Sequence, residues 1–249
     1  MAITLSKVAK RANHQHLPHF QDLTRVGTFV TLNTSCWEIT LREVIGRRGL
    51  IRVIAPTIVH RLLDSLKSLR HLNMVNQRIC PENIGMTRDG RRLVHLELSD
   101  MSEPKRPWCQ QAYSSTAYTK RVLSSEFGYS RTGFYQDRYS VGATILELLV
   151  GSDVLLQAER PCQMENLLEF CQPYIDETLH GLLQDLLFDG AHVSYDQFAL
   201  DLCVLEPQRI TESATRLDVA VNEDGKLQEI VSAFRDRREQ RFGELEERY

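Results

Sequence analysis

The sequence predicts a mainly α-helical domain, class α+β, with a few short β-strands and a helical extension at its C-terminus. Apolar residues recur at helical spacing in several long segments, whereas runs rich in β-branched residues are few and short. Of the 249 residues, 42% are hydrophobic and 25% are charged, which is the balance of an ordinary globular protein with room for a large core.

The first predicted elements are one or two short strands within residues 25–32, where β-branched and aromatic residues dominate. A short helix is expected over 40–47. The next helix is predicted to begin at Pro56, since a first helical position tolerates proline, and to end near Asn73. Its apolar positions form a wide stripe that indicates a core helix: Ile58, Val59, Leu62, Leu63, Leu66, Leu69 and Leu72.

A hairpin strand is predicted over 91–98, directly after the turn-forming pair Asp89-Gly90. Residues 99–135 have no sustained period and are expected to form a long loop. Helices are then predicted in five segments: from Asp137 to Gly151, over 164–171, 177–188 and 195–205, and a shorter one from near Thr211.

Composition also bears on the class of function. The net charge of −3 gives no support for nucleic-acid binding, and no apolar run reaches the roughly 20 residues that span a bilayer. Six cysteines without a CxxC pair predict reduced thiols in an intracellular protein of the cytoplasm or cytoskeleton. Residues 1–21 hold three Lys or Arg side chains and no acid, so they are either a solvated tail or a mitochondrial targeting segment.

Three segments carry a family resemblance. Residues 76–83 read Asn-Gln-Arg-Ile-Cys-Pro-Glu-Asn and follow a long apolar helix; residues 137–151 contain Asp-Arg-Tyr-Ser-Val-Gly and then Glu-Leu-Leu-Val-Gly; residues 207–211 read Pro-Gln-Arg-Ile-Thr. In this order they resemble the catalytic loop, the central helix and a late segment in the large lobe of eukaryotic protein kinases. The resemblance covers residues 40–217 and implies a helical domain like the kinase C-lobe.

The residues of kinase chemistry are replaced. Arg78 stands where the family has the catalytic aspartate, and Cys80 where it has a lysine. The loop begins with Asn76 in place of histidine. Asn83, a metal ligand in active kinases, is retained, but we expect its side chain to satisfy backbone groups of the loop instead.

The nucleotide-binding parts are missing as well. No Asp-Phe-Gly follows the 91–98 strand, and before residue 46 the chain has one glycine, Gly27, and only the lysines Lys7 and Lys10. A Gly-rich loop and an ATP-binding lysine cannot be built from these residues. The sequence therefore predicts a pseudokinase with the small lobe largely missing, no enzyme activity, and no cofactor or metal.

Three residues of the resemblance are expected to be structural. Asp137 is either a helix N-cap or a clamp on the backbone of the catalytic loop, and Gly142 belongs to the same motif. Arg209 would in kinases pair with the glutamate of an Ala-Pro-Glu motif. Arg121 lies in that region here, so we expect Glu126 to substitute, since a buried guanidinium needs a partner.

The predicted organisation is an N-terminal tail (1–24), a truncated kinase-like domain (25–217) and a charged amphipathic helix (218–249). The helix either folds back on the domain or binds a partner through one apolar face. The candidate partner-binding residues on that face are Leu227, Ile230, Val231, Phe234, Phe242 and Leu245.

We expect a catalytically inactive scaffold, or a structural subunit of a multi-subunit complex, whose partners are other proteins. The alternative is a regulatory pseudokinase that modulates an active kinase or weakly binds nucleotide.

Overall fold

The computed structural model describes residues 20–26, 29–34, 38–71, 79–87, 93–95, 129–155, 161–188 and 205–223, and all structural statements below concern these residues. This part of the chain is mostly helical with short strands, as the sequence predicts.

An antiparallel ribbon opens the described chain. Strand β1 (Phe20–Val26) pairs with β2 (Phe29–Thr34), and Leu23 lies opposite Leu32. The strands predicted within 25–32 are confirmed, but β1 begins earlier, inside the stretch expected to be a tail.

A second sheet is three-stranded and antiparallel, in the order β3 (Ile39–Thr40), β4 (Ile84–Met86), β5 (Leu93–His95). Strand β5 confirms the strand predicted over 91–98. Because β3 precedes the first helices and β4 follows them, this sheet brings the two ends of that helical stretch together.

Helix α2 (Leu41–Ile45) confirms the helix expected over 40–47. It begins with a capping box in which Thr40 and Glu43 satisfy each other's backbone N–H groups. Three apolar side chains face the core and are buried: Leu41, Val44 and Ile45.

Helix α3 (Arg48–His71) starts earlier than predicted. Pro56 lies inside the helix and not at its first position. An interior proline removes one backbone hydrogen bond and costs about 3 kcal/mol. Ile51 and Ala55 are nevertheless buried in the same core cluster as Ile58, so burial of the extra turns offsets that cost.

Helix α4 (Tyr129–Val150) also starts earlier than the predicted Asp137, so residues 129–135 of the expected loop are helical. Extending a formed helix costs far less than nucleating one, which allows these weak helix formers to continue the buried segment. The helix ends before Gly151, as predicted. Gly151 has a φ of 101°, which glycine adopts without strain, and a short helix α5 (Ser152–Leu155) follows.

The remaining helices are α6 (Pro161–Cys171), α7 (Glu177–Leu187) and α9 (Pro207–Glu223). The predictions for α6 and α7 are confirmed. Helix α9 is 17 residues long and begins at Pro207, so the expectation of a shorter helix from near Thr211 was wrong. Proline suits a first helical position, and Ile210 extends the buried face backwards. The helix predicted over 195–205 lies outside the described residues except for Leu205.

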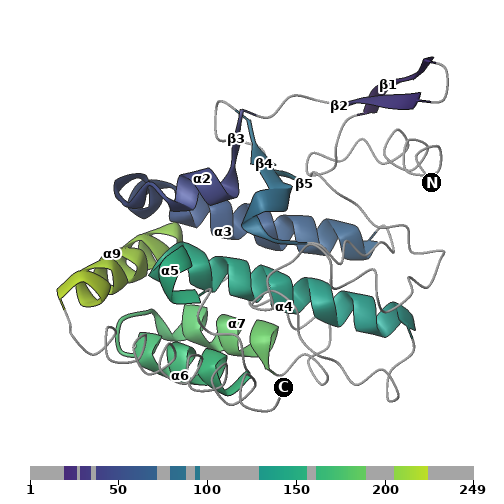
Figure 1. Ribbon diagram of the computed structural model, residues 1–249. Helices are drawn as coiled ribbons and strands as arrows, with labels where there is room; N and C mark the ends of the chain where they lie inside the picture. Colours follow the sequence, from purple (N-terminus) through teal and green to yellow (C-terminus); the bar gives the residue numbers. More distant parts are fainter. Residues whose placement is uncertain are drawn as a thin grey trace, which may run out of the picture.

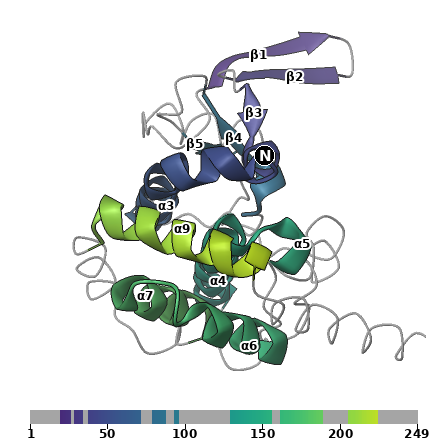
Figure 2. The same cartoon turned by 90° about the vertical axis from the view of Figure 1, so that its left-hand side faces the viewer.

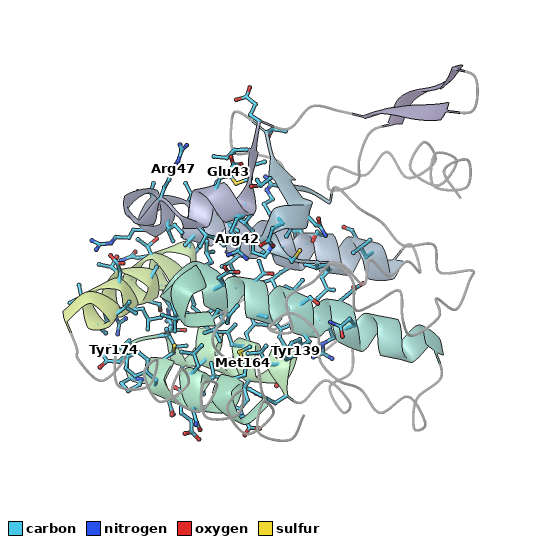
Figure 3. All side chains as sticks on the ribbon, in the orientation of Figure 1. Arg42, Glu43, Arg47, Tyr139, Met164 and Tyr174 are labelled. Carbon is cyan, nitrogen blue, oxygen red and sulfur yellow. The ribbon has the colours of Figure 1, made fainter. Side chains whose placement is uncertain are left out.

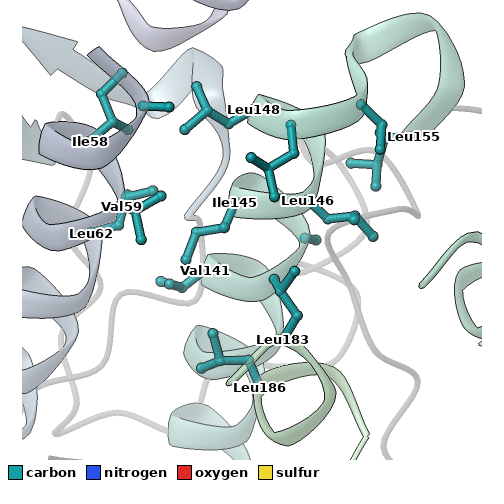
Figure 4. Close-up of a cluster of buried hydrophobic side chains, with 14 of the residues drawn as sticks. Ile58, Val59, Leu62, Val141, Ile145, Leu146, Leu148, Leu155, Leu183 and Leu186 are labelled. Atoms are coloured by element: carbon teal, nitrogen blue, oxygen red, sulfur yellow. The ribbon is translucent and has the colours of Figure 1, made fainter. Parts of the chain in front are cut away.

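Helix α4 is the centre of the structure: every residue from Asp137 to Gly151 is buried. Helices α3 and α7 lie on opposite sides of it, and α9 packs against both α3 and α4 (Figures 1 and 2). Apolar side chains from these helices belong to one cluster, which includes Val59, Ile145 and Leu183 (Figure 4). No helix in the described part of the chain is long and apolar enough to cross a membrane.

Candidate functional site

The segment that resembles a kinase catalytic loop is described from Ile79 onwards and forms a tight turn. Pro81–Asn83 make one 3₁₀ turn, η1, in which the Asn83 N–H donates to the Cys80 carbonyl at 2.9 Å. The turn leads directly into β4. Pro81 is buried and the Asn83 side chain is half-buried. The turn therefore starts at a buried proline and continues into the three-stranded sheet.

Cys80, which the resemblance matches with a lysine of kinases, is buried. Burial, with the negative charge of Glu82 beside it, raises the pKa of the thiol to about 12. The thiol is consequently protonated at neutral pH, and its sulfur is not a nucleophile there.

Arg42 of α2 fastens this turn to the central helix. Its Nε donates to Glu82 Oε1 at 2.7 Å, and its Nη2 lies 2.7 Å from the same oxygen. Its Nη1 pairs with Glu147 Oε1 of α4. Figure 3 shows Arg42 between α2 and α4. One guanidinium thus joins α2, η1 and α4, and we call these three residues the Arg42 cluster.

The members of the Arg42 cluster differ greatly in exposure. The side chain of Glu147 is 0% exposed, that of Arg42 24% and that of Glu82 53%. Partial burial alone would raise the pKa of Glu82, but the hydrogen bonds and positive charge of Arg42 hold it below its ordinary value. Both carboxylates are therefore engaged by the same cation.

This arrangement can hold the turn in place. A general base needs an acceptor free to take a substrate proton, and the Glu82 carboxylate is instead held by Arg42. Among the described residues, no group of three or more His, Cys, Asp or Glu side chains is placed to hold a metal ion.

Two predicted structural residues lie in α4. Asp137 is fully buried inside the helix, well past its first residue Tyr129, so the N-cap interpretation was wrong. Gly142 lies where α4 crosses α7: a Cβ added there would be 2.8 Å from Leu186 Cβ and 3.1 Å from atoms of Leu187. The absence of a side chain at residue 142 lets the two helices approach closely.

The third, Arg209, lies on α9 and differs from the expectation. Its side chain is 51% exposed and not buried. It donates to Asp176 Oδ2 at 3.1 Å and lies 3.5 Å from Glu206. Asp176 is the N-cap of α7, so Arg209 ties α9 to the start of α7. The proposed substitute, Glu126, lies outside the described residues.

Other candidates also fall outside the described residues. These are Asn76 and Arg78 of the loop, together with the C-terminal stripe Leu227, Ile230, Val231, Phe234, Phe242 and Leu245.

Sequence reasoning missed Arg42 and the role of Glu147. A signal was present, because Glu147 is a single acid within the apolar run 145–150. A charge in such a run must be paired when it is buried. No pattern pointed to Arg42 as the partner.

In comparisons with known proteins, no protein-family model and no curated protein matches this chain.

Proposed function

We propose that this chain is a catalytically inactive relative of the protein kinases that works by binding other proteins, as a scaffold or as a structural subunit of a larger assembly. The observation that carries the proposal is the replacement of the two catalytic-loop residues by Arg78 and Cys80. An arginine cannot accept a substrate proton, and a buried neutral thiol cannot neutralise a transferring phosphoryl group.

The Arg42 cluster gives further support. Its salt bridges attach the turn to α2 and α4, and they use carboxylates that lie close to the loop. A loop fastened in this way is suited to a structural role, since it keeps its shape without a ligand.

The order of elements also supports a kinase-like large lobe. A long helix (α3) precedes the Pro-Glu-Asn turn, a strand pair (β4 and β5) follows it, and then comes a central buried helix (α4). In the family, the central helix is the one that begins with the aspartate matched by Asp137. The burial of Asp137 and of all residues to Gly151 fits that position.

The proposed binding role rests on the small lobe, which is largely missing from this chain. In a kinase, a small lobe covers the top of the large lobe. The described residues before β3 provide only the two-stranded ribbon of β1 and β2. A large lobe with so little cover leaves surface that a partner protein can occupy.

The inactive half of the proposal is tested by nucleotide binding. We expect Mg-ATP to leave the melting temperature of the purified chain unchanged, because neither a Gly-rich loop nor a lysine is available to hold it. The matched control is an active kinase under the same conditions. Stabilisation by more than about 1 kcal/mol would contradict the proposal and favour the regulatory pseudokinase.

A further inference from the structure

Helix α3 has a proline in its interior, and this residue divides the helix into two parts. Pro56 has no N–H, so the helical hydrogen bond from residue 56 back to the Arg52 carbonyl cannot form. The proline ring also crowds that carbonyl, which is why helices commonly bend at such positions. Residues 48–55 are therefore coupled only weakly, through the backbone, to residues 56–71.

The two parts of α3 are anchored differently in the core. After Pro56, large aliphatic side chains are buried at six positions: Ile58, Val59, Leu62, Leu63, Leu66 and Leu69. Among residues 51–55, Ile51 and the small Ala55 are buried, Ile54 is partly buried, and Val53 is 74% exposed. Because apolar burial stabilises in proportion to the area removed from water, residues 51–55 are held less firmly by the core than the rest of the helix.

An ion pair attaches this first part of α3 to α9. Arg52 Nε donates to Asp218 Oδ2 at 2.8 Å, and Arg52 Nη2 pairs with the same oxygen. The side chain of Asp218 is 8% exposed and that of Arg52 is 43% exposed. Breaking a pair that includes a buried carboxylate is costly, so this contact holds the first part of α3 against α9.

We propose that residues 48–55 form a strap, hinged at Pro56 and latched to α9 by Arg52 and Asp218, which opens locally while the rest of α3 stays folded. The missing bond at residue 56 lets the strap open without disturbing the next turn of the helix. Local openings of this kind use the least firmly anchored parts of a fold. Opening would uncover Ile51 and Ala55 beside the exposed Val53. The strap is thus a conformational device, and it does not depend on the proposed function.

Hydrogen exchange of the purified full-length chain tests the latch. The amides of residues 52–55 report on the strap, and those of residues 61–66 report on the rest of α3. We expect Asp218→Asn to speed exchange at residues 52–55 about tenfold or more, while exchange at residues 61–66 changes by less than about twofold. Arg52→Gln removes the same ion pair from the other side and should have the same effect.

The matched control is Glu212→Gln. It removes the carboxylate of an ion pair within α9, in which Glu212 lies 3.7 Å from Arg216 and both side chains are half exposed. Exchange in both regions of α3 should stay within about twofold of wild type. Equal acceleration of both regions by Asp218→Asn would show that α3 opens only as a whole, and no acceleration would show that the ion pair is not a latch. Either result would overturn the proposal.

Restoring the missing backbone bond tests the hinge. Pro56→Ala supplies an N–H that can donate to the Arg52 carbonyl and couple the two parts of α3. In this background we expect Asp218→Asn to speed exchange at residues 52–55 by less than about threefold. A tenfold rise that persists without the proline would identify ordinary fraying of a helix end and would overturn the hinge.

Discussion

Arg42 makes two ion pairs, one with a half-exposed carboxylate and one with a buried carboxylate. The two pairs therefore contribute different amounts of stability. The pair with Glu82 is half exposed, and pairs of that kind contribute about 0–1 kcal/mol. The side chain of Glu147 is fully buried. Removing one member of a buried pair typically costs about 3–5 kcal/mol. The Arg42–Glu147 pair should therefore dominate the effect of any change at Arg42.

We expect Arg42→Ala to lower the free energy of unfolding by about 3 kcal/mol or more, because it removes the Arg42 guanidinium from the buried ion pair with Glu147. Chemical denaturation monitored by circular dichroism measures this. Arg47→Ala is the matched control, since Arg47 is exposed on the same stretch of chain and should change stability by about 0.5 kcal/mol or less.

The double variant Arg42→Ala/Glu147→Gln separates the two pairs. Removing the carboxylate charge should recover part of the loss, whereas Glu82→Gln in the same background should recover little. A loss of less than 1 kcal/mol for Arg42→Ala would show that the Arg42 cluster does not hold the turn in place.

Gly142 and Gly181 provide a contrast between two helical glycines. We expect Gly142→Ala to destabilise by about 1–3 kcal/mol, because its Cβ would meet Leu186 Cβ at 2.8 Å. At Gly181, inside α7, an added Cβ meets nothing within 4 Å. Gly181→Ala should stabilise by about 0.5–1 kcal/mol through helix propensity. The melting temperatures of both variants measure these opposite changes. Stabilisation by both substitutions would contradict the close crossing of α4 and α7.

At the scale of elements, the junction between α7 and α9 is fastened at Asp176. Its side chain caps α7 by accepting from the Thr178 N–H at 3.0 Å, and it also accepts from Arg209. Its own N–H donates to Ser213 Oγ of α9 at 2.9 Å. Partial burial acts to raise the pKa of Asp176, but the Thr178 bonds and Arg209 together lower it from its ordinary value of 3.8.

This junction predicts a dependence of stability on pH. A carboxylate whose pKa is lower in the folded state contributes stability above its ordinary pKa and loses it as the pH falls through the folded pKa. We expect Asp176→Ala to cost about 0.5–2 kcal/mol at pH 7 through loss of the cap. Asp176→Asn keeps a capping oxygen and should cost less.

The difference in stability between wild type and Asp176→Asn should shrink as the pH falls below about 4. Denaturation at pH 7, 5 and 3 measures it. A constant difference over this range would show that the charge of Asp176 contributes nothing.

Local patterns predicted several elements well. The stripe from Ile58 to Leu69 identified the core of α3, and Gly151 marked the end of α4. The starts of α3, α4 and α9 were harder: α3 continues back past Pro56 to Arg48, α4 begins before Asp137, and α9 begins at Pro207. Local propensity is a weak guide there, since tertiary packing decides how far a helix continues.

At the scale of the whole molecule, the contacts that fasten the fold join residues far apart in sequence. Arg42 reaches Glu147, and Arg52 Nε donates to Asp218 Oδ2 at 2.8 Å, which links the start of α3 to the later part of α9. A single sequence contains no pattern that indicates which of its distant residues are in contact. The motifs predicted the Pro-Glu-Asn turn and the central helix, but not the arginine that joins them.

The described part of the chain contains a helical body and the separate two-stranded sheet of β1 and β2. The body holds the Pro-Glu-Asn turn in place through the Arg42 cluster. Among the described residues, the ribbon of β1 and β2 pairs with no third strand. The scaffold role that we propose predicts that the chain acts through the proteins that bind it.

Association is therefore the property to measure first. The tagged chain would be isolated from its native cells and passed over a size-exclusion column, with the stoichiometry of co-eluting proteins determined. We predict elution in a complex of fixed composition, with the chain present in a constant ratio to its partners. Elution as a free monomer with no constant partner would contradict the account.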